Sequence, residues 1–248
     1  MKERPESKQQ NVIEVRNLWK KFGSFAANKD LSFDVKRAEI FGFLGANGAG
    51  KTTAIKILCG LWKPTSGEVK VSGYDVNTET EMVKRNIGYM SQKFSLYEDL
   101  TPVENIRFYG GIYGLSRRRM KEKTDEALST LGLKEVRDKP VSALPLGWKQ
   151  KLAFTVALLH EPGIVFLDEP TGGVDPVTRR QFWNMIYAEA DNGTTIFVTT
   201  HYMDEAEYCD RVSIMVDGEI HALDTPATLK EKYHAESMNE LFLKLARR

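Results

Sequence analysis

The sequence predicts an α/β fold with a mainly parallel sheet, an N-terminal antiparallel β-subdomain and an inserted α-helical subdomain. Short apolar runs such as "EIFGFL" and "GIVFL" occur in both halves of the chain and are typical of strands buried on both faces. Between these halves, from Thr101 to about Leu159, the pattern becomes helical. We therefore expect a disordered polar tail over residues 1–11 and one domain over 12–248, with a helical subdomain inserted at about 101–159.

The first half of the chain alternates strands with one helix. "VIEVRNL" has the alternating pattern of a strand, and "LSFDV" and "EIFGFL" are predicted as two more. The loop "GANGAGKTT" follows the last of these directly, and "AIKILCGLW" has helical spacing. After the turn cluster "KPTSGE", we expect strands at "EVKVSG" and "IGYMSQ".

The middle of the chain carries clear helix-start signals. Thr101, Pro102 and Glu104 form a capping-box start with proline in the first turn. The charged segment "SRRRMKEKTDEALSTLGL" is predicted as an amphipathic helix that ends at Gly132. "ALPLGWKQKLAF" is predicted to open a third helix, with Pro145 in its first turn.

The last third returns to the α/β pattern. "GIVFL" and "TTIFVTT" are predicted strands, and the helix between them starts at Asp175 as N-cap with Pro176 behind it. "MDEAEYC" indicates a short helix, and "RVSIMVDGEIHAL" a hairpin that turns at Asp217 and Gly218. Residues 237–248 suggest a terminal helix.

Composition excludes several classes of protein. The 35 Lys and Arg residues against 34 Asp and Glu give a net charge of +1, so no nucleic-acid partner is expected. Two cysteines form neither a disulfide framework nor a metal cluster, which suits a reducing compartment. No apolar run approaches the roughly 18 residues that predict a membrane span, so we expect any membrane link to go through a partner.

The loop from Gly45 to Thr52 matches the phosphate-binding pattern G-x-x-x-x-G-K-[ST] and predicts a P-loop NTPase core. It lies after a strand and before a helix, as the chemistry requires. Its glycines let backbone N–H groups surround phosphate oxygens, and the helix N-terminus favours the same negative charge. Lys51 is expected on the β- and γ-phosphates, and the Thr52 hydroxyl on Mg²⁺.

Acidic and histidine side chains follow two later strands. Asp168 ends "IVFLD", at the strand end where α/β sheets place ligand-binding groups, and is expected to hold Mg²⁺. Glu169 is the candidate general base for the attacking water. His201 follows "TTIFVTT", and because parallel strand ends lie close together, we expect it to hydrogen-bond the γ-phosphate and to hold Glu169 and water in place.

With these motifs in their order and spacing, nearly the whole chain resembles the ATP-binding subunit of ABC transporters. "GANGAGKTT" resembles the Walker A loop, which implies nucleotide-binding residues at Gly45, Ala46, Asn47, Gly48, Ala49, Gly50, Lys51, Thr52 and Thr53. "IVFLDEP" resembles Walker B with its catalytic glutamate, and "THYMDEAE" the switch region with its histidine.

Three further segments resemble motifs of the same family. "YMSQKFSLYEDLTPVEN" is similar to the Q-loop region and puts Gln92 at its glutamine, which implies contact with Mg²⁺. "GGVD" is similar to the D-loop and puts Asp175 at its aspartate. "WKKFG" is similar to the A-loop, which implies that the ring of Phe22 stacks on adenine.

The resemblance implies ATP and Mg²⁺ as cofactors, and a head-to-tail dimer of ATP-binding domains, homomeric or heteromeric. It also implies integral-membrane permease subunits as partners, and a peripheral place on the cytoplasmic face of the membrane through that permease. The segments "MDEAEYCDRVSIMVDGEI" and "SMNELFLKLARR" are most similar to the branch that exports drugs, polysaccharides or lipids.

The signature motif departs from the family pattern L-S-G-G-Q. Here the aligned residues run from Leu144 to Trp148, and only the leucine and Gly147 remain. Pro145 offers neither hydroxyl nor N–H, although free N–H groups are expected at Leu146, Gly147 and Trp148. We therefore expect weakened γ-phosphate sensing from this side, with Gly147 kept for close approach to phosphate.

Two alternatives to an exporter ATPase stay open at this point. The altered signature fits a nucleotide-binding module of the same kind with weak turnover. The other alternative is a non-transport ABC-type ATPase that acts on ribosomes or DNA. The single domain and the near-neutral net charge argue against it.

Overall fold

An antiparallel sheet opens the chain in the computed structural model, which describes residues 10–93 and 95–246. Its strand order is β2-β1-β4-β5, formed by β1 (Asn11–Phe22), β2 (Phe25–Lys36), β4 (Ser66–Val71) and β5 (Tyr74–Asp75). The antiparallel subdomain is thus where the sequence predicted it. Most of the expected tail, residues 1–9, lies outside the described residues, and Asn11 already belongs to β1.

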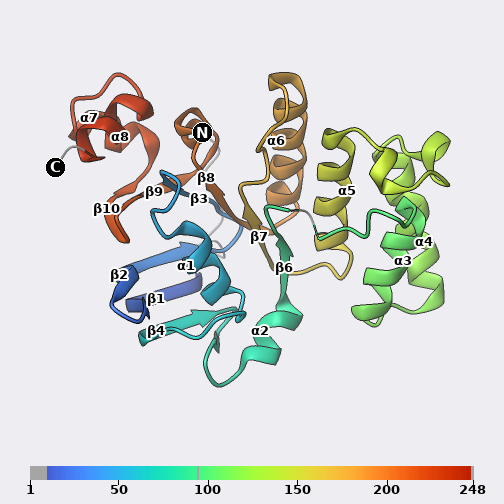
Figure 1. Ribbon diagram of the computed structural model, residues 1–248, viewed down its shortest axis with the longest axis horizontal. Coiled ribbons are helices and arrows are strands. Elements are labelled where there is room, and N and C mark those ends of the chain that lie inside the picture. The colour runs from blue at the N-terminus through green and yellow to red at the C-terminus, as the bar shows by residue number, and fades with distance from the viewer. Residues whose placement is uncertain (1–9, 94, 247–248) are drawn as a thin grey trace.

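A second sheet forms the centre of the molecule in the order β10-β9-β3-β8-β7-β6 (Figure 1). Its pairs are parallel except for β9–β10. Its strands are β3 (Ile40–Gly45), β6 (Ile87–Met90), β7 (Ile164–Asp168), β8 (Thr195–Thr200), β9 (Arg211–Val216) and β10 (Glu219–Asp224). Leu44 pairs with Thr200 and Asp168 with Thr199, so the carboxyl ends of β3, β8 and β7 lie at one edge of the sheet.

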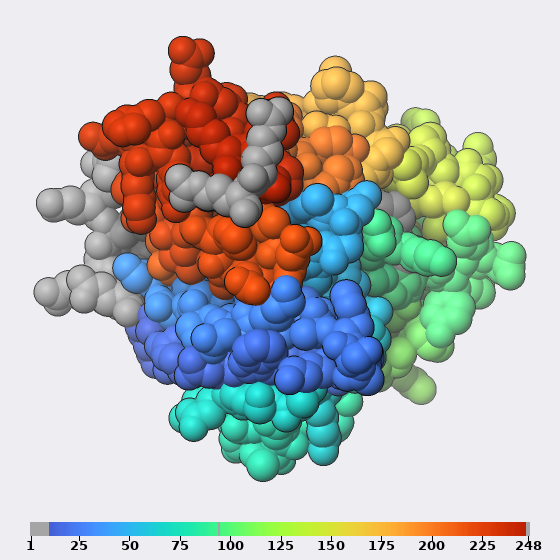
Figure 2. Space-filling view, turned by 60° about the vertical axis from the view of Figure 1, so that its left-hand side comes forward, coloured from blue at the N-terminus to red at the C-terminus, as the bar shows by residue number. Residues whose placement is uncertain are grey.

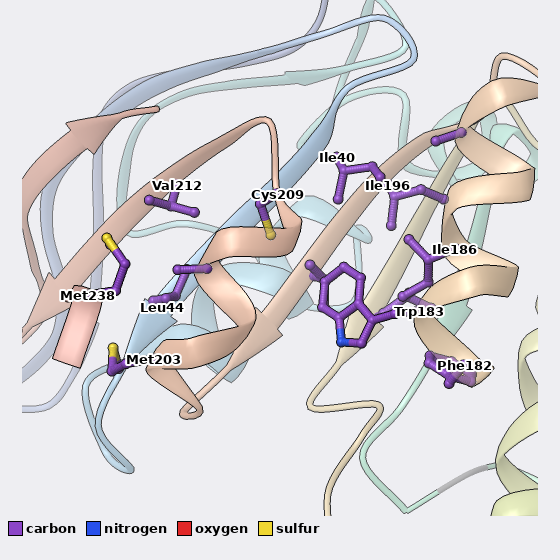
Figure 3. Close-up of a cluster of buried hydrophobic side chains, with 14 of the residues drawn as sticks. Ile40, Leu44, Phe182, Trp183, Ile186, Ile196, Met203, Cys209, Val212 and Met238 are labelled. Carbon is purple, nitrogen blue, oxygen red and sulfur yellow. The ribbon is translucent and has the colours of Figure 1, made fainter. Parts of the chain in front are cut away.

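Helices cover this sheet and enclose its apolar residues. They are α1 (Lys51–Leu58), α2 (Thr80–Asn86), α6 (Pro176–Asp191), η4 (Met203–Tyr208), α7 (Pro226–Lys232) and α8 (Met238–Ala246). Figure 3 shows Trp183 of α6 directed into a cluster with Ile196 of β8 and Ile186. The buried indole N–H of Trp183 donates to Glu205 Oε1 at 3.2 Å, which satisfies its polar atom within the core.

The helical insertion packs around an apolar cluster of its own. It contains α3 (Pro102–Ile112), α4 (Arg117–Thr130), η2 (Lys134–Val136), η3 (Val141–Ala143) and α5 (Leu146–Leu158). Ile106 of α3, Leu128 of α4 and Leu152 of α5 meet in this cluster, and Trp148 packs against it. Trp148, at the start of α5, therefore contributes to the packing of the insertion.

The capping box predicted at Thr101 is present, since its hydroxyl accepts from the Glu104 N–H and the Glu104 carboxylate accepts from the Thr101 N–H. Helices α2 and α7 were not predicted from the sequence. The expected place of Pro145 in the first helical turn is wrong by one residue, because Pro145 is the N-cap and α5 begins at Leu146.

In Figure 2 the C-terminal helices α7 and α8 (red) lie above the antiparallel sheet (blue), and the helical insertion (green to yellow-green) lies at the right of the view. Among the described residues, no helix combines the length and apolar character needed to cross a membrane.

Candidate functional site

The phosphate-binding loop connects β3 to α1 at the carboxyl edge of the central sheet. Gly50 caps α1 with φ +102°, and a Cβ there would meet the carbonyl oxygen of Ala27 at 2.2 Å. Only glycine fits this combination of left-handed backbone and close contact. The side-chain amide of Asn28 in β2 also donates to the Gly50 carbonyl at 3.1 Å, and this hydrogen bond attaches the loop to β2.

Lys51 is held by the loop itself. Its side chain is only 3% exposed, and its ammonium donates to the carbonyls of Gly45 at 2.8 Å and Ala46 at 3.1 Å. The same ammonium lies 3.2 Å from Glu169 Oε1. A buried positive charge is thus kept at the mouth of the loop by neighbouring oxygens.

Glu169 is the meeting point of three predicted site residues. Its Oε2 accepts from the Gln92 amide at 3.2 Å and lies 3.0 Å from His201 Nδ1, while Oε1 faces Lys51. The residue has φ 49°, a left-handed conformation that is strained for a side chain of this size. Its N–H donates to the carbonyl of Thr199 at 3.1 Å, which holds this backbone in place.

Asp168, the residue before Glu169, has its own set of contacts. Its Oδ1 accepts from the Thr199 hydroxyl at 2.7 Å and from the Thr52 hydroxyl at 3.3 Å. Burial raises the pKa of Asp168, and these two hydrogen bonds oppose the shift. The carboxylate is thus a charged group kept in a buried site at a cost in folding free energy.

Replacing Asp168 by asparagine is therefore expected to raise the melting temperature of the nucleotide-free protein at pH 8. Because the folded-state pKa lies above the unfolded one, the stability that protonation confers is lost as the pH rises through the folded-state pKa. A gain of about 1 kcal/mol would raise the melting temperature of a domain this size by roughly 2–4 °C. Thermal melts over a series of decreasing pH values should show the difference in melting temperature between the two proteins narrowing as Asp168 becomes protonated.

Asp125→Asn provides the matched control for that experiment, because Asp125 is exposed on α4. Exposed substitutions of this kind normally leave stability unchanged. A lower melting temperature for Asp168→Asn at pH 8 would show that the bonds from Thr199 and Thr52 outweigh the cost of burial.

A cavity of about 280 Å³ adjoins the loop. Of the predicted site residues, it is lined by Asn47, Gly48, Gly50, Lys51, Thr52, Thr53, Gln92 and Glu169. Gly45, Ala46 and Ala49 belong to the same loop, and Asp168 and His201 touch lining residues. The structure therefore brings the loop from Gly45 to Thr53 together with Gln92, Asp168, Glu169 and His201.

Phe22 does not line this cavity. Its ring packs edge-on against Trp62 with centroids 5.4 Å apart, and it is 45% exposed. Phe25, across the same turn, lines the cavity and is 62% exposed. Sequence reasoning missed Phe25 because its only signal was position, three residues after the predicted aromatic.

Gly147 and Asp175 lie together in a second cavity of about 270 Å³, away from the phosphate loop of the same chain. Both carboxylate oxygens of Asp175 bond to its own helix: Oδ1 accepts from the N–H groups of Val177 and Thr178, and Oδ2 from the Thr178 hydroxyl. The hydroxyl bond in particular lowers the pKa of Asp175. Asp175 is the N-cap of α6, as the sequence predicted.

The expectation of three free N–H groups at the start of α5 is wrong for Trp148, whose N–H donates to the Pro145 carbonyl at 3.0 Å. The N–H groups of Leu146 and Gly147 have no hydrogen-bond partner among residues 10–93 and 95–246. The close approach that requires Gly147 is to protein, since a Cβ there would lie 2.5 Å from Thr178 Cγ2.

Gly147→Ala is therefore expected to destabilise the protein by roughly 1–3 kcal/mol, the usual cost of overpacking. Urea unfolding curves measure this loss. The same substitution in a Thr178→Ser background should recover most of it, because serine lacks Cγ2 but keeps the hydroxyl that bonds Asp175. Gly111→Ala on α3 meets no atom within 4 Å and should cost nothing. Failure of the rescue would contradict the steric explanation.

Comparisons with known proteins identify the family of this chain. The family model described as ABC transporter matches residues 28–172. The chain is 50% identical over 231 residues to the probable multidrug ABC transporter ATP-binding protein YbhF of Escherichia coli K12; this covers 93% of the chain but only 39% of YbhF. It is 35% identical over 231 residues to the linearmycin resistance ATP-binding protein LnrL of Bacillus subtilis, covering 93% of the chain and 74% of LnrL.

Solved structures with a similar fold are ATP-binding subunits or cassettes. An ATP-binding subunit of an ABC transporter superposes with a TM-score of 0.85 at 29% identity, covering 94% of this chain and 99% of that one. A dimeric, post-hydrolysis ATP-binding cassette bound to ADP and phosphate superposes with a TM-score of 0.78 at 26% identity, covering 86% and 98%. With its family match, its relatives and its site all in agreement, this chain belongs to the ABC transporter family as an ATP-binding domain of that family.

Proposed function

We propose that this domain binds ATP with Mg²⁺, hydrolyses it, and powers an export permease in the membrane. The observation that carries the proposal is the convergence of Lys51, Gln92 and His201 on the single carboxylate of Glu169 beside the phosphate loop. A base, a phosphate-binding cation and two polar groups that orient the base thus share one site.

The residues present fit Mg²⁺. The Thr52 hydroxyl and the Asp168 carboxylate meet at 3.3 Å, and both supply the oxygen ligands that this ion prefers. Residues 10–93 and 95–246 contain no group of three or more His, Cys, Asp or Glu side chains able to hold a metal. This suits an ion that completes its shell with water and substrate phosphates, with Gln92 as a further proposed ligand. Bound there, Mg²⁺ would neutralise charge on the phosphate oxygens.

Different residues of the chain would bind the phosphates, accept the proton and stack on the adenine. Backbone N–H groups of residues 45–52 and the Lys51 ammonium bind phosphate oxygens. The contact of Lys51 with Glu169 is thereby replaced by a contact with the nucleotide. Glu169, released from Lys51 but still held by Gln92 and His201, accepts the proton of the attacking water. Phe22 remains the proposed partner of the adenine ring, with Phe25 as a second aromatic at the cavity.

Assembly as a dimer is the second part of the proposal. The start of α5 and Asp175 lie in a cavity of their own, so a second domain is needed to bring them to a nucleotide. The dimeric cassette bound to ADP and phosphate, similar in fold, supports this arrangement. The descriptions of YbhF as a probable multidrug ABC transporter ATP-binding protein and of LnrL as a linearmycin resistance ATP-binding protein support drug transport. A permease partner, and through it a place on the cytoplasmic face of the membrane, belong to the same proposal.

A module with weak turnover is the second candidate, and one observation favours it. The N-cap of α5 is Pro145, which makes no side-chain cap bond and has no hydroxyl for a γ-phosphate. The backbone N–H groups of Leu146 and Gly147 are left as donors at this helix end. The end of the helix favours negative charge by at most about 2 kcal/mol.

Phosphate release by the purified chain tests the two candidates. We expect hydrolysis that requires Mg²⁺, stops in EDTA, and rises per monomer with protein concentration because two chains form the active unit. Hydrolysis that persists in EDTA would contradict the assignment of Thr52 and Asp168. Mg²⁺-dependent ATP binding without phosphate release would favour the weak-turnover module.

A further inference from the structure

A cavity of about 550 Å³ lies where the helical insertion meets the core. It lies between α4 and α5 on one side and α6 on the other, and none of the predicted nucleotide-site residues lines it. Figure 1 shows these three helices next to one another, beyond β7. Its volume is about twice that of the phosphate-loop cavity and falls in the range of small-molecule sites.

One part of the wall is apolar. Phe154 and Leu158 of α5 and Met185 of α6 line it, together with Ala127 of α4. Aromatic, branched and flexible thioether side chains of this kind favour the apolar body of a ligand.

The charged part of the wall is negative overall. Glu126, Glu161 and Glu189 line the cavity, and Lys123 is the one cation among the lining residues. Arg119, outside the lining, also pairs with Glu161. The Lys123 ammonium lies 3.0 Å from Glu161 and 3.4 Å from Glu126, so it is already shared between two carboxylates. The carboxylate of Glu189 makes no hydrogen bond or ion pair with any residue in 10–93 or 95–246. Burial raises its pKa, and the more distant charge of Lys123 opposes this shift.

Two helix ends add to the negative electrostatic potential in the cavity. The last turn of α5, which ends at Leu158, and the last turn of α6, which ends at Asp191, both line the cavity. The C-terminal end of a helix carries partial negative charge and favours cations. A half-buried carboxylate without a partner is thus placed where the backbone also attracts positive charge.

We infer that this cavity binds a small amphipathic organic cation, with its ammonium group on Glu189 and its apolar body against Leu158 and Met185. The ammonium supplies the hydrogen bonds that Glu189 lacks, and the apolar body covers the wall that faces it. An occupant would contact α4 and α5 of the insertion and α6 of the core together.

Binding of 4-phenylbutylamine to the full chain tests this inference by titration calorimetry. The neutral 4-phenylbutanol and the anionic 4-phenylbutyrate are probes of the same shape. We expect saturable binding of the amine, at least about tenfold weaker binding of the alcohol, and no binding of the acid, because hydrogen bonds to charged groups contribute that much. Equal affinity for amine and alcohol, or no saturable binding of the amine, would overturn the inference.

Variants locate the site. Glu189→Gln should weaken the binding of the amine at least about tenfold and leave the affinity for the alcohol unchanged. Glu231→Gln changes an exposed glutamate of α7 and should alter the affinity for neither probe. Ala188→Trp, on the exposed rim of α6, should fill the cavity and reduce binding of both probes. Thermal melts show that each variant is folded. Unchanged amine binding in both Glu189→Gln and Ala188→Trp would place the amine elsewhere and refute the site.

Discussion

Glu169→Gln is expected to abolish ATP hydrolysis and leave ATP binding in place. Glutamine keeps the size of the side chain and its ability to contact Gln92 and His201, which lie 3.2 and 3.0 Å from the carboxylate. Its amide, however, has no basic oxygen to take a proton from water. Loss of a general base typically costs about 10²–10⁴-fold in rate. Phosphate release and equilibrium ATP binding, measured on the same preparation, separate the two effects.

The control for this variant is Glu135→Gln, which makes the same chemical change at an exposed position in η2. It should hydrolyse ATP at the wild-type rate. If Glu169→Gln retains that rate as well, Glu169 is not the base. A variant that loses ATP binding together with hydrolysis would instead show that the Glu169 contacts hold the phosphate loop in shape.

Lys51→Met is expected to have the largest effect on ATP binding. Methionine keeps most of the buried stem, but the ammonium that the Gly45 and Ala46 carbonyls hold in place is removed. Hydrogen bonds to charged groups contribute about 1.5–3 kcal/mol each, so the dissociation constant of ATP should rise about 10- to 100-fold or more. Titration with a fluorescent ATP analogue, followed by competition with ATP, measures the change.

Lys56→Met is the matched control for the charge itself. Lys56 lies on the same helix, and its ammonium contacts the ring of Trp62 at 4.5 Å rather than the phosphate loop. This variant should bind ATP as the wild type does. Equal affinities for Lys51→Met and Lys56→Met would mean that Lys51 does not contact the nucleotide.

Much of the site could be predicted because its motifs are short and local. The loop from Gly45 to Thr52 needs only a strand before it and a helix after it, and both are visible in the hydrophobic pattern. Asp168 could be placed because it ends a short apolar run, and Asp175 because an N-cap aspartate followed by proline is a strong helix start. In each case the signal and the structure it specifies lie within a few residues.

Other parts could not be predicted because they depend on partners distant in the sequence. Thr199 holds both the Asp168 carboxylate and the backbone N–H of Glu169, yet in the sequence it is one of several threonines in a strand. Gly147 was expected to allow approach to phosphate, whereas the atom it avoids belongs to Thr178 on another helix. Phe25 lies at the cavity because β1 and β2 pair across the turn that joins them.

The sequence by itself determined the class of fold, the phosphate loop and the candidate groups for the chemistry, because each of these follows from local spacing and residue type. The contact of His201 with Glu169 was expected from the sequence, and only the tertiary structure decided that Lys51 and Gln92 meet on the same carboxylate. The physical reason is the strand order β3-β8-β7-β6, which aligns the ends of strands far apart in the sequence at one edge of the sheet. The cavity at Glu189 has the same origin, because helices from the insertion and the core enclose it and neither would form it alone.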